Sequence, residues 1–264
     1  MSGAPPPLLF LTGASSGIGQ ALARRFGAAG WRLALVARRQ DELRRFVSSQ
    51  SYGEDDAQIY VADVADASSI TAAGRACIER QGLPDAVIAN AGISVGIDSA
   101  RVEDLPVLRD TLQTNVFGVA ATFQPFIEPM RHRRRGTLVG VASVAGIRGL
   151  PGHAAYCASK AGAIAYCESL RGECRPFGVR VVTLVPGYVD TPLTRSNPYR
   201  MPFLMSADAF ADSAFAAISA GRSYRVIPWQ MALVAKVLRA LPNRVFDRLF
   251  AGRPRKPRRT ESAG

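Results

Sequence analysis

The stretch LLFLTGASSGIG, residues 8–19, decides the fold of this chain. Its apolar first part, Leu8–Thr12, has the length of a buried strand, and a helical pattern near Gly17–Ala29 follows it. The glycines between strand and helix permit a tight turn and let the backbone approach a pyrophosphate, which the N-terminus of a helix attracts. The spacing G-x-x-x-G-x-G in this strand–turn–helix context therefore predicts a dinucleotide-binding loop.

The rest of the chain repeats this alternation of short apolar runs and helical patterns, which is typical of a βαβ sheet. We expect strands at Leu8–Thr12, Arg32–Ala37, Gln58–Val61, Ala86–Ala89, Gly136–Ala142, Arg180–Val185 and Tyr224–Ile227. We expect helices near Gly17–Ala29, Asp41–Ser49, Ala67–Gln81, Leu105–Arg134, Ala155–Arg175 and Ala207–Ala220. These elements predict a single α/β domain, residues 1–228, built on a doubly wound seven-stranded parallel sheet with helices on both faces. Ligands of such sheets bind at the carboxyl ends of the strands.

The composition is that of a globular protein. The 264 residues are 48% hydrophobic, which allows one large domain with a substantial core. The apolar run Leu8–Leu11 is too short for a signal peptide or a membrane span, so we expect a cytoplasmic protein. The four cysteines contain no CxxC pair and the chain has only two histidines, which indicates a reduced compartment and no metal site.

The formal net charge of +12 is concentrated near the C-terminus, where residues 222–264 hold 11 basic and 2 acidic side chains. A second basic run, Arg131–Arg135, ends a long helical pattern. Cations at the C-terminal end of a helix complement its dipole. We therefore interpret this second run as a solvated helix end, and we expect no nucleic-acid partner.

The residues after the second expected strand indicate which nicotinamide cofactor would bind. An NAD site commonly has an acidic residue there to hold the ribose 2′-hydroxyl, whereas a 2′-phosphate requires arginine. Ala37 stands at the acidic position, and Arg38 and Arg39 follow it. Guanidinium groups bind phosphate well. The sequence therefore predicts a preference for NADP(H) over NAD(H).

Tyr156 and Lys160 are four residues apart within an expected helix, so their side chains share one helical face. A free tyrosine titrates near pH ~10, and a fixed cation nearby lowers that pKa. Only three of the 33 basic residues are lysine, so a lysine at this position is not readily explained by chance. The pair is a candidate for moving a proton at neutral pH.

Together these motifs resemble the short-chain dehydrogenase/reductase family, and the resemblance covers about residues 8–220. Residues 12–19 are similar to the family's TGxxxGxG loop. Asp63-Val64 is similar to its adenine-contacting pair, and Asn90-Ala91-Gly92 to its NAG motif. Pro186-Gly187, with Val189 and Thr191, is similar to the segment that holds the nicotinamide carboxamide.

The resemblance implies a Rossmann-like fold and a set of site residues. The implied cofactor contacts are Gly13, Ser15, Ser16, Gly17, Ile18, Gly19, Arg38, Arg39, Asp63, Val64, Asn90, Ala91, Gly92, Tyr156, Lys160, Pro186, Gly187, Val189 and Thr191. The family's catalytic tetrad falls on Asn115, Ser143, Tyr156 and Lys160. Ala89 and Ala142 depart from the usual NNAG and SS patterns, but neither departure removes a tetrad side chain.

The tetrad implies a division of labour in hydride transfer, because the cofactor carries the hydride and the protein must supply a proton and stabilise the substrate oxygen. Tyr156 is expected to act as the general acid in reduction and the general base in oxidation. Ser143 is expected to hydrogen-bond the substrate oxygen. Lys160 is expected to lower the pKa of Tyr156 and bind the nicotinamide ribose, and Asn115 to hold a water that links Lys160 to solvent.

Three loops are expected to bind substrate: Ile93–Ala100, Val144–His153 and Tyr188–Ser206. The last is rich in apolar side chains, which favours a lid over an apolar substrate, although an ordinary lid packed on the core stays an open alternative. We interpret His153 as a solvated loop residue.

The C-terminal extension, residues 229–264, begins with an amphipathic pattern over Trp229–Leu241 that resumes after Pro242. Lys236 and Arg239 interrupt this pattern, which argues against a transmembrane span. Two interpretations stay open: a helix packed on its own domain or on another subunit, and a helix that lies on an anionic membrane surface. We expect the basic end, residues 253–259, to be disordered.

The leading hypothesis is an NADP(H)-dependent oxidoreductase that acts on CH–OH groups and interconverts a carbonyl and a secondary alcohol. A nucleotide-sensing regulator and a membrane-associated scaffold on the same fold are the alternatives, since a fold alone does not give function. Such regulators often lose the catalytic tyrosine or lysine, and this chain has both. The resemblance also implies a small-molecule substrate and a homo-oligomer, either a dimer or a tetramer.

Overall fold

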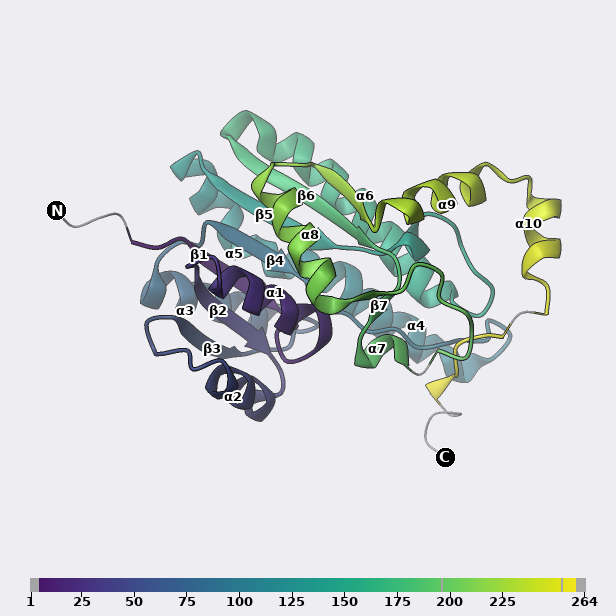
Figure 1. The fold of residues 1–264 in the computed structure, drawn as a ribbon, viewed down its shortest axis with the longest axis horizontal. Coiled ribbons are helices and arrows are strands. Elements are labelled where there is room, and N and C mark those ends of the chain that lie inside the picture. Colours follow the sequence, from purple (N-terminus) through teal and green to yellow (C-terminus); the bar gives the residue numbers. More distant parts are fainter. Residues whose placement is uncertain (1–4, 196, 253, 260–264) are drawn as a thin grey trace.

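A parallel β-sheet runs through the centre of the molecule and carries helices on both faces (Figure 1). The computed structural model describes residues 5–195, 197–252 and 254–259. The strands of the sheet are β1 (Leu8–Thr12), β2 (Arg32–Ala37), β3 (Ala57–Val61), β4 (Ala86–Ala89), β5 (Gly136–Val141), β6 (Val179–Pro186) and β9 (Tyr224–Ile227). Their order is β3-β2-β1-β4-β5-β6-β9, and every neighbouring pair is parallel. The doubly wound seven-stranded sheet predicted from the sequence is thus confirmed.

The helices follow the predicted alternation with small shifts at their ends. They are α1 (Gly17–Gly27), α2 (Gln40–Ser49), α3 (Ala67–Gln81), α4 (Leu105–Leu112), α5 (Gly118–Arg133), α6 (Ala154–Cys174), α7 (Pro192–Arg195), α8 (Ala207–Ser219), α9 (Trp229–Ala240) and α10 (Asn243–Phe250). A small parallel sheet of β7 (Val189–Asp190) and β8 (Met205–Ser206) was not expected. It closes the base of the segment 188–206, which the sequence indicated only as a loop.

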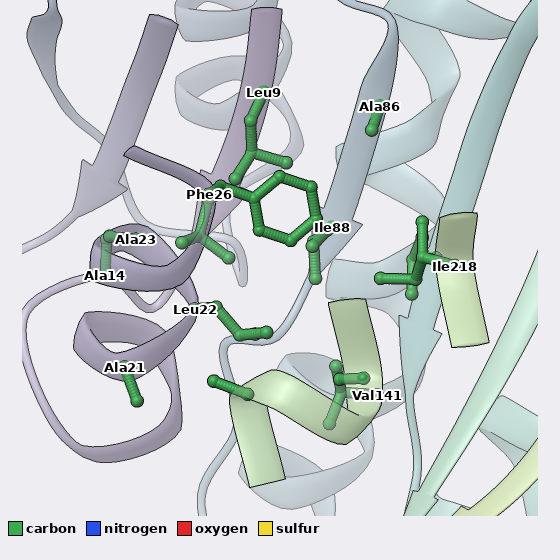
Figure 2. Packing of buried hydrophobic residues seen from close by; sticks show 14 of the residues in the cluster. Leu9, Ala14, Ala21, Leu22, Ala23, Phe26, Ala86, Ile88, Val141 and Ile218 are labelled. Atoms are coloured by element: carbon green, nitrogen blue, oxygen red, sulfur yellow. The ribbon is translucent and has the colours of Figure 1, made fainter. Parts of the chain in front are cut away.

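Successive residues of β1 pack into two separate cores, because neighbouring side chains of a strand point to opposite faces. Leu9 lies in the layer formed with α1, α2 and α8, where Figure 2 shows it near Ile88 and Phe26. Leu8 and Phe10 belong to the opposite layer, formed with α3, α5 and α6. Burying a large apolar side chain contributes roughly 1.5–3 kcal/mol, so the sheet is a rigid base for the loops at its carboxyl edge.

The strand order reverses between β1 and β4, and such a reversal opens a crevice at the carboxyl ends of the strands. The turn after β1 crosses this point. Gly13 has a φ of +68°, in the left-handed region that favours glycine. A Cβ at Gly19 would overlap the carbonyl group of Gly13. Glycine at these two positions therefore lets α1 begin directly over the turn.

The helix predicted over Leu105–Arg134 is interrupted. α4 and α5 are joined by a π-helical turn, Gln113–Phe117. A π turn widens the helical repeat locally, and such turns are frequent at functional sites. Asn115 lies in this turn and is fully buried. The periodic apolar pattern on both sides made the segment look like one continuous helix.

The C-terminal extension leaves the sheet after β9 and lies at one end of the molecule (Figure 1). Met231 and Ala235 bury one face of α9 against the domain, and Phe246 is the buried residue of α10. Residues 254–259 then return to the loop after β4, where Gly96 and Arg258 form a parallel bridge. The sequence predicted a disordered end over residues 253–259. Position 253 lies outside the described residues, and within 254–259 Arg258 and Arg259 find acidic partners on the domain.

Among the helices of the described residues, none combines the length and the apolar character that crossing a membrane requires.

Candidate active site

A cavity of about 450 Å³ opens at the carboxyl ends of the central strands, and we call it the central cavity. Every residue that the sequence analysis assigned to the cofactor lines it except Gly19, which packs behind the turn against Gly13. Ser143, Tyr156 and Lys160 line the same cavity, whereas Asn115 is buried behind its wall. Motifs that are spread over most of the chain thus meet at one place.

Sequence reasoning missed part of the cavity wall. The missed residues all lie within two positions of a motif residue, which is the signal that would have found them: Val36, Ala37, Ala62, Thr114, Val141 and Ala142. The other additional lining residues, Ile93, Pro192, Leu193 and Thr194, belong to loops that the sequence assigned to the substrate. They belong to the same loops and strand ends as the motifs, so the backbone that carries a motif residue also brings its neighbours to the cavity.

Asn90 ties the loop after β4 to the phosphate turn. Its Nδ2 donates to the carbonyl oxygen of Thr12 at 3.1 Å, and its backbone N–H donates to Thr12 Oγ1 at 3.1 Å. The N–H of Ala91 donates to the same hydroxyl at 3.2 Å. These bonds join the two strands on either side of the crevice, so Asn90 supports the shape of the cavity at its centre.

The two arginines after β2 have different partners. Arg38 Nη1 lies 3.4 Å from Asp63 Oδ2 in an exposed ion pair. Arg39 Nη2 donates to Ser15 Oγ at 3.1 Å and to Ser16 Oγ at 3.4 Å. Because hydroxyl groups are neutral, the guanidinium of Arg39 keeps its full charge beside the phosphate turn, while a carboxylate partly neutralises that of Arg38.

Tyr156 and Lys160 lie one turn apart on α6. The Lys160 ammonium nitrogen is 5.8 Å from the centroid of the Tyr156 ring, and it donates to the carbonyl oxygen of Val141 at 2.9 Å. Lys160 is buried, and desolvation lowers its pKa to about 8. The helix therefore holds both side chains toward the end of β5.

The pKa of Tyr156 differs from the sequence expectation. Although the residue is only partly buried, desolvation of its hydroxyl raises the pKa to about 12, and the hydrogen bond with Ser143 lowers it. Lys160 is not among the groups that shift it. Burial therefore sets the direction of the shift, and the phenol keeps its proton at neutral pH.

Ser143 follows β5 and faces Tyr156. Its Oγ accepts a hydrogen bond from the N–H of Ala145 at 3.2 Å, which orients the side chain at the start of a short 3₁₀ turn. The hydroxyl also lies close enough to Tyr156 to lower the pKa of the phenol. Two hydroxyl groups thus lie side by side on the cavity wall, where both can reach one substrate oxygen.

Both the oxygen and the nitrogen of the Asn115 side-chain amide form hydrogen bonds. Oδ1 accepts from the N–H of Ile93 at 2.8 Å, and Nδ2 donates to the Ile93 carbonyl and to Ser159 Oγ, each at 2.9 Å. A Cβ on Gly92 would lie 3.0 Å from Asn115 Oδ1 and 3.4 Å from Lys160 Nζ. The π turn therefore places Asn115 next to the lysine and makes it the support of the loop after β4.

His153 is not the solvated residue that the sequence suggested. It is buried, and its two ring nitrogens lie 3.0 Å from the Pro151 carbonyl oxygen and 3.1 Å from the Tyr199 hydroxyl. Because the carbonyl can only accept, Nδ1 carries the proton and Nε2 accepts from Tyr199. Desolvation lowers the pKa of His153, so the ring is neutral at pH 7. The correction follows from the aromatic side chain of Tyr199, which covers the ring.

The described residues contain no group of His, Cys, Asp and Glu that could hold a metal ion.

Known proteins with related sequences and structures are oxidoreductases. The family model of the short chain dehydrogenases matches residues 8–201. An uncharacterized oxidoreductase of Myxococcus xanthus is 38% identical over 90% of this chain and 93% of its own length. An alcohol dehydrogenase of Thermococcus sibiricus, solved with 5-hydroxy-NADP, is 26% identical, covers 84% of this chain and 95% of its own, and has a TM-score of 0.74. A variant of actinorhodin polyketide ketoreductase, solved with NADPH, is also 26% identical, with a TM-score of 0.77 over 86% of this chain and 97% of its own.

The match of the family model over most of the chain, together with the full-length relative, shows that this protein belongs to the short-chain dehydrogenase/reductase family of oxidoreductases.

Proposed function

We propose that this protein is an NADP(H)-dependent oxidoreductase that transfers a hydride between the nicotinamide ring and a carbonyl or secondary-alcohol carbon. The observation that carries the proposal is a single cavity lined both by the phosphate turn and by Ser143, Tyr156 and Lys160. The donors of this cavity fit a dinucleotide, since glycines, hydroxyls and two arginines surround the turn. When bound, the cofactor supplies the hydride.

The chain's own residues supply the proton. With a pKa of about 12, the Tyr156 hydroxyl carries its proton at neutral pH, and an acid in its protonated form suits carbonyl reduction. Ser143 would hold the same substrate oxygen and stabilise the negative charge that develops on it. Lys160 would stabilise the phenolate that remains and bind the ribose hydroxyls, since its ammonium group lines the cavity.

A preference for NADP(H) is supported by the cations after β2. Arg39 is the stronger candidate for the 2′-phosphate, because its guanidinium is bonded only to hydroxyls in the described residues. Arg38 shares its charge with Asp63 and would contribute less. Two structurally similar proteins were solved with such cofactors, one with 5-hydroxy-NADP and the other with NADPH.

An apolar small molecule is the proposed substrate class. Tyr188 and Tyr199 pack with their rings tilted and the ring centroids 6.4 Å apart, and His153 contacts the second ring. Both tyrosines belong to the segment that the sequence identified as a lid. If these side chains border the bound substrate, they would favour an apolar ligand, with a small number of polar groups to orient it.

A turnover screen tests the proposed function. Purified protein is incubated with NADPH or NADH and a panel of aliphatic, cyclic and aromatic ketones, and the loss of absorbance of the reduced nicotinamide is followed. We expect turnover with apolar ketones and a higher kcat/KM with NADPH. A protein that binds NADPH but turns over none of the ketones and none of the matching alcohols would be a nucleotide-binding regulator instead.

We also propose a homo-oligomer that pairs through α4 and α5. These helices and α6 border a shallow depression lined by Leu105, Leu112, Phe117 and Tyr166. Leu105 and Phe117 are exposed there, and pairing would remove this apolar surface from water. Sedimentation of Leu105→Glu tests the interface, because a buried unpaired carboxylate would shift the protein toward the monomer.

A peripheral contact of the extension, residues 229–264, with an anionic membrane surface is the last part of the proposal. Trp229, Leu233 and Val237 are 59%, 57% and 60% exposed and recur every fourth residue on α9, on the side opposite the buried Met231. Lys236 lies next to this exposed stripe. Apolar side chains flanked by cations are typical of helices that lie on anionic lipid.

Charge favours lipid over a second copy of the chain, since a copy with net charge +12 would present the same cations to this face. Sedimentation with phosphatidylglycerol vesicles tests the contact. Binding should fall about tenfold in the double variant Trp229→Gln, Leu233→Gln, but not in Val102→Gln, which changes an equally exposed apolar residue elsewhere. Wild-type protein that stays in the supernatant would exclude the membrane contact.

A further inference from the structure

The C-terminal segment 254–259, which we call the strap, lies across loops that the sequence assigned to the substrate. It returns from α10 toward α4 and α7 as the last part of the described chain (Figure 1). The N–H of Gly96, in the loop after β4, donates to the Pro257 carbonyl at 3.0 Å. The next N–H, that of Ile97, donates to the Gly152 carbonyl at 3.2 Å, which joins the loop before α6 to the same place.

Two arginines anchor the end of the strap. Arg258 Nε donates to Asp104 Oδ2 at 2.7 Å and Nη2 donates to Oδ1 at 3.1 Å, so the ion pair is bidentate. Asp104 is buried and also accepts from the N–H of Asp98 at 2.7 Å. Arg259 Nη2 pairs with Asp110 at 3.1 Å on the surface. Removing the strap would take from Asp104 its bidentate cation.

Lys256 is the part of the strap that reaches toward the central cavity. The residue is only 8% exposed, and its ammonium nitrogen donates to Ser94 Oγ at 3.0 Å and to the Leu193 carbonyl oxygen at 3.1 Å. Ile93, next to Ser94, and Leu193 both line the central cavity. Lys256 thus bridges the loop after β4 and α7, which are two walls of the cavity.

The contact between strap and loops is close enough to require glycine. A Cβ at Gly96 would overlap the carbonyl group of Lys256, and a Cβ at Gly152 would come 2.9 Å from side-chain carbons of Arg255. Gly96 does not have a positive φ, so its backbone would accept alanine if the strap were absent. The close approach of the strap therefore explains why position 96 is a glycine.

We propose that the strap is part of the substrate site, and that Lys256 is a positioning residue that holds the Ser94 loop and α7 at the separation the substrate needs. The inference rests on the proposed function, because it assigns the two loops to substrate binding. Two loops held in place before binding spare the substrate the entropy of ordering them. Loss of the bridge should therefore weaken substrate binding more than it slows the chemistry, since Tyr156 and Ser143 stand on α6 and β5.

Two variants release the strap by independent routes. Lys256→Met keeps the length and the apolar stem of the side chain but removes the ammonium group. Gly96→Ala leaves the strap sequence intact and pushes its backbone away. The matched controls are Gly172→Ala, at an exposed helical glycine with no neighbour within 4 Å of an added Cβ, and Arg222→Met, at an exposed cation just before β9. Position 222 lies at the amino ends of the strands, opposite the central cavity.

The first measurement does not depend on catalysis. Hydrogen exchange of the Gly96 backbone amide, which donates to the Pro257 carbonyl, reports the docking of the strap. The amide of Ile93, held by Asn115, is the internal reference. We expect exchange at position 96 to be at least about tenfold faster in both variants, as for the loss of its hydrogen bond to the strap, and unchanged in the controls. Unchanged exchange in both variants would overturn the docking of the strap.

The second measurement is steady-state reduction of the best ketone from the turnover screen. We expect KM for the ketone to rise roughly tenfold in both variants, kcat to change less than about threefold, and the Kd of NADPH to stay within about threefold. Faster exchange with an unchanged KM would overturn the positioning role of Lys256. If the wild-type protein turns over no substrate, the proposed function fails. The exchange measurement still tests whether the strap docks on the loop after β4.

Discussion

The Lys160 ammonium nitrogen lies 5.8 Å from the centroid of the Tyr156 ring and donates its hydrogen bond to the carbonyl oxygen of Val141. The pair shares one face of α6, as the spacing requires, but burial and not mutual attraction dominates the pKa of each group. Tyr156 keeps its proton at neutral pH, and Lys160 loses its charge near pH 8. The proposed chemistry can be tested on each side chain separately.

Replacing Tyr156 by phenylalanine should remove the proton donor with little change in shape. We expect kcat for ketone reduction to fall by a factor of at least about 10²–10⁴, the usual contribution of general acid–base catalysis. The Kd of NADPH, measured by fluorescence, should stay within about threefold. A Tyr156→Phe variant with more than about half of the wild-type turnover would show that another group supplies the proton.

The pH dependence should report Lys160. Desolvation lowers its pKa to about 8, so the ammonium is present below this pH and is lost as the pH rises through it. We therefore expect kcat for ketone reduction to be constant near neutral pH and to decline above pH 8. Lys256 has a similarly lowered pKa, so Lys256→Met is the control and should keep the same midpoint. A midpoint that moves in Lys256→Met would assign the titration to the strap.

The two arginines after β2 should differ in their effect on cofactor choice. In Arg39→Ala, the ratio of kcat/KM with NADPH to that with NADH should fall roughly tenfold to a hundredfold, because a charge-assisted contact to phosphate is lost. In Arg38→Ala the fall should be smaller, since Asp63 already shares that charge. Equal losses with both cofactors in Arg39→Ala would mean that this arginine supports the turn and does not recognise a 2′-phosphate.

Asn115 should matter for stability as well as for activity. Asn115→Ala would leave the partly buried N–H and C=O of Ile93 without this partner, at a cost of up to about 1–3 kcal/mol for each group left unsatisfied. We expect the free energy of unfolding, from urea titration, to fall by about 2–4 kcal/mol. Asn243→Ala is the control, because Asn243 is exposed and accepts one hydrogen bond from Arg148, and it should cost less than about 1 kcal/mol. Equal losses would contradict a supporting role for Asn115.

Much of the fold could be predicted because its signals are local. The apolar run of β1, the glycines of the turn and the 3.6-residue pattern of α1 each lie within a few residues, and the structure has these elements within two residues of the predicted ends. Most of the cavity wall could also be predicted from the sequence. In βα units the motifs that follow the strands all lie at the carboxyl edge of the sheet. Periodicity was misleading between α4 and α5, because a π turn interrupts the α-helical hydrogen bonding there while helical residues continue on both sides.

By itself, the sequence determined the parallel sheet, the phosphate turn and the shared helical face of Tyr156 and Lys160, because these depend on residues close together in the chain. Only the tertiary structure decided which partners the side chains have. It put Asn115 against Ile93, paired Arg38 with Asp63, buried His153 under Tyr199 and brought the strap to the substrate loops. Ser94 and Lys256 are 162 residues apart in the chain, and no local pattern encodes their contact. Such contacts, and the desolvation that sets the pKa values, depend on how distant segments pack around one cavity.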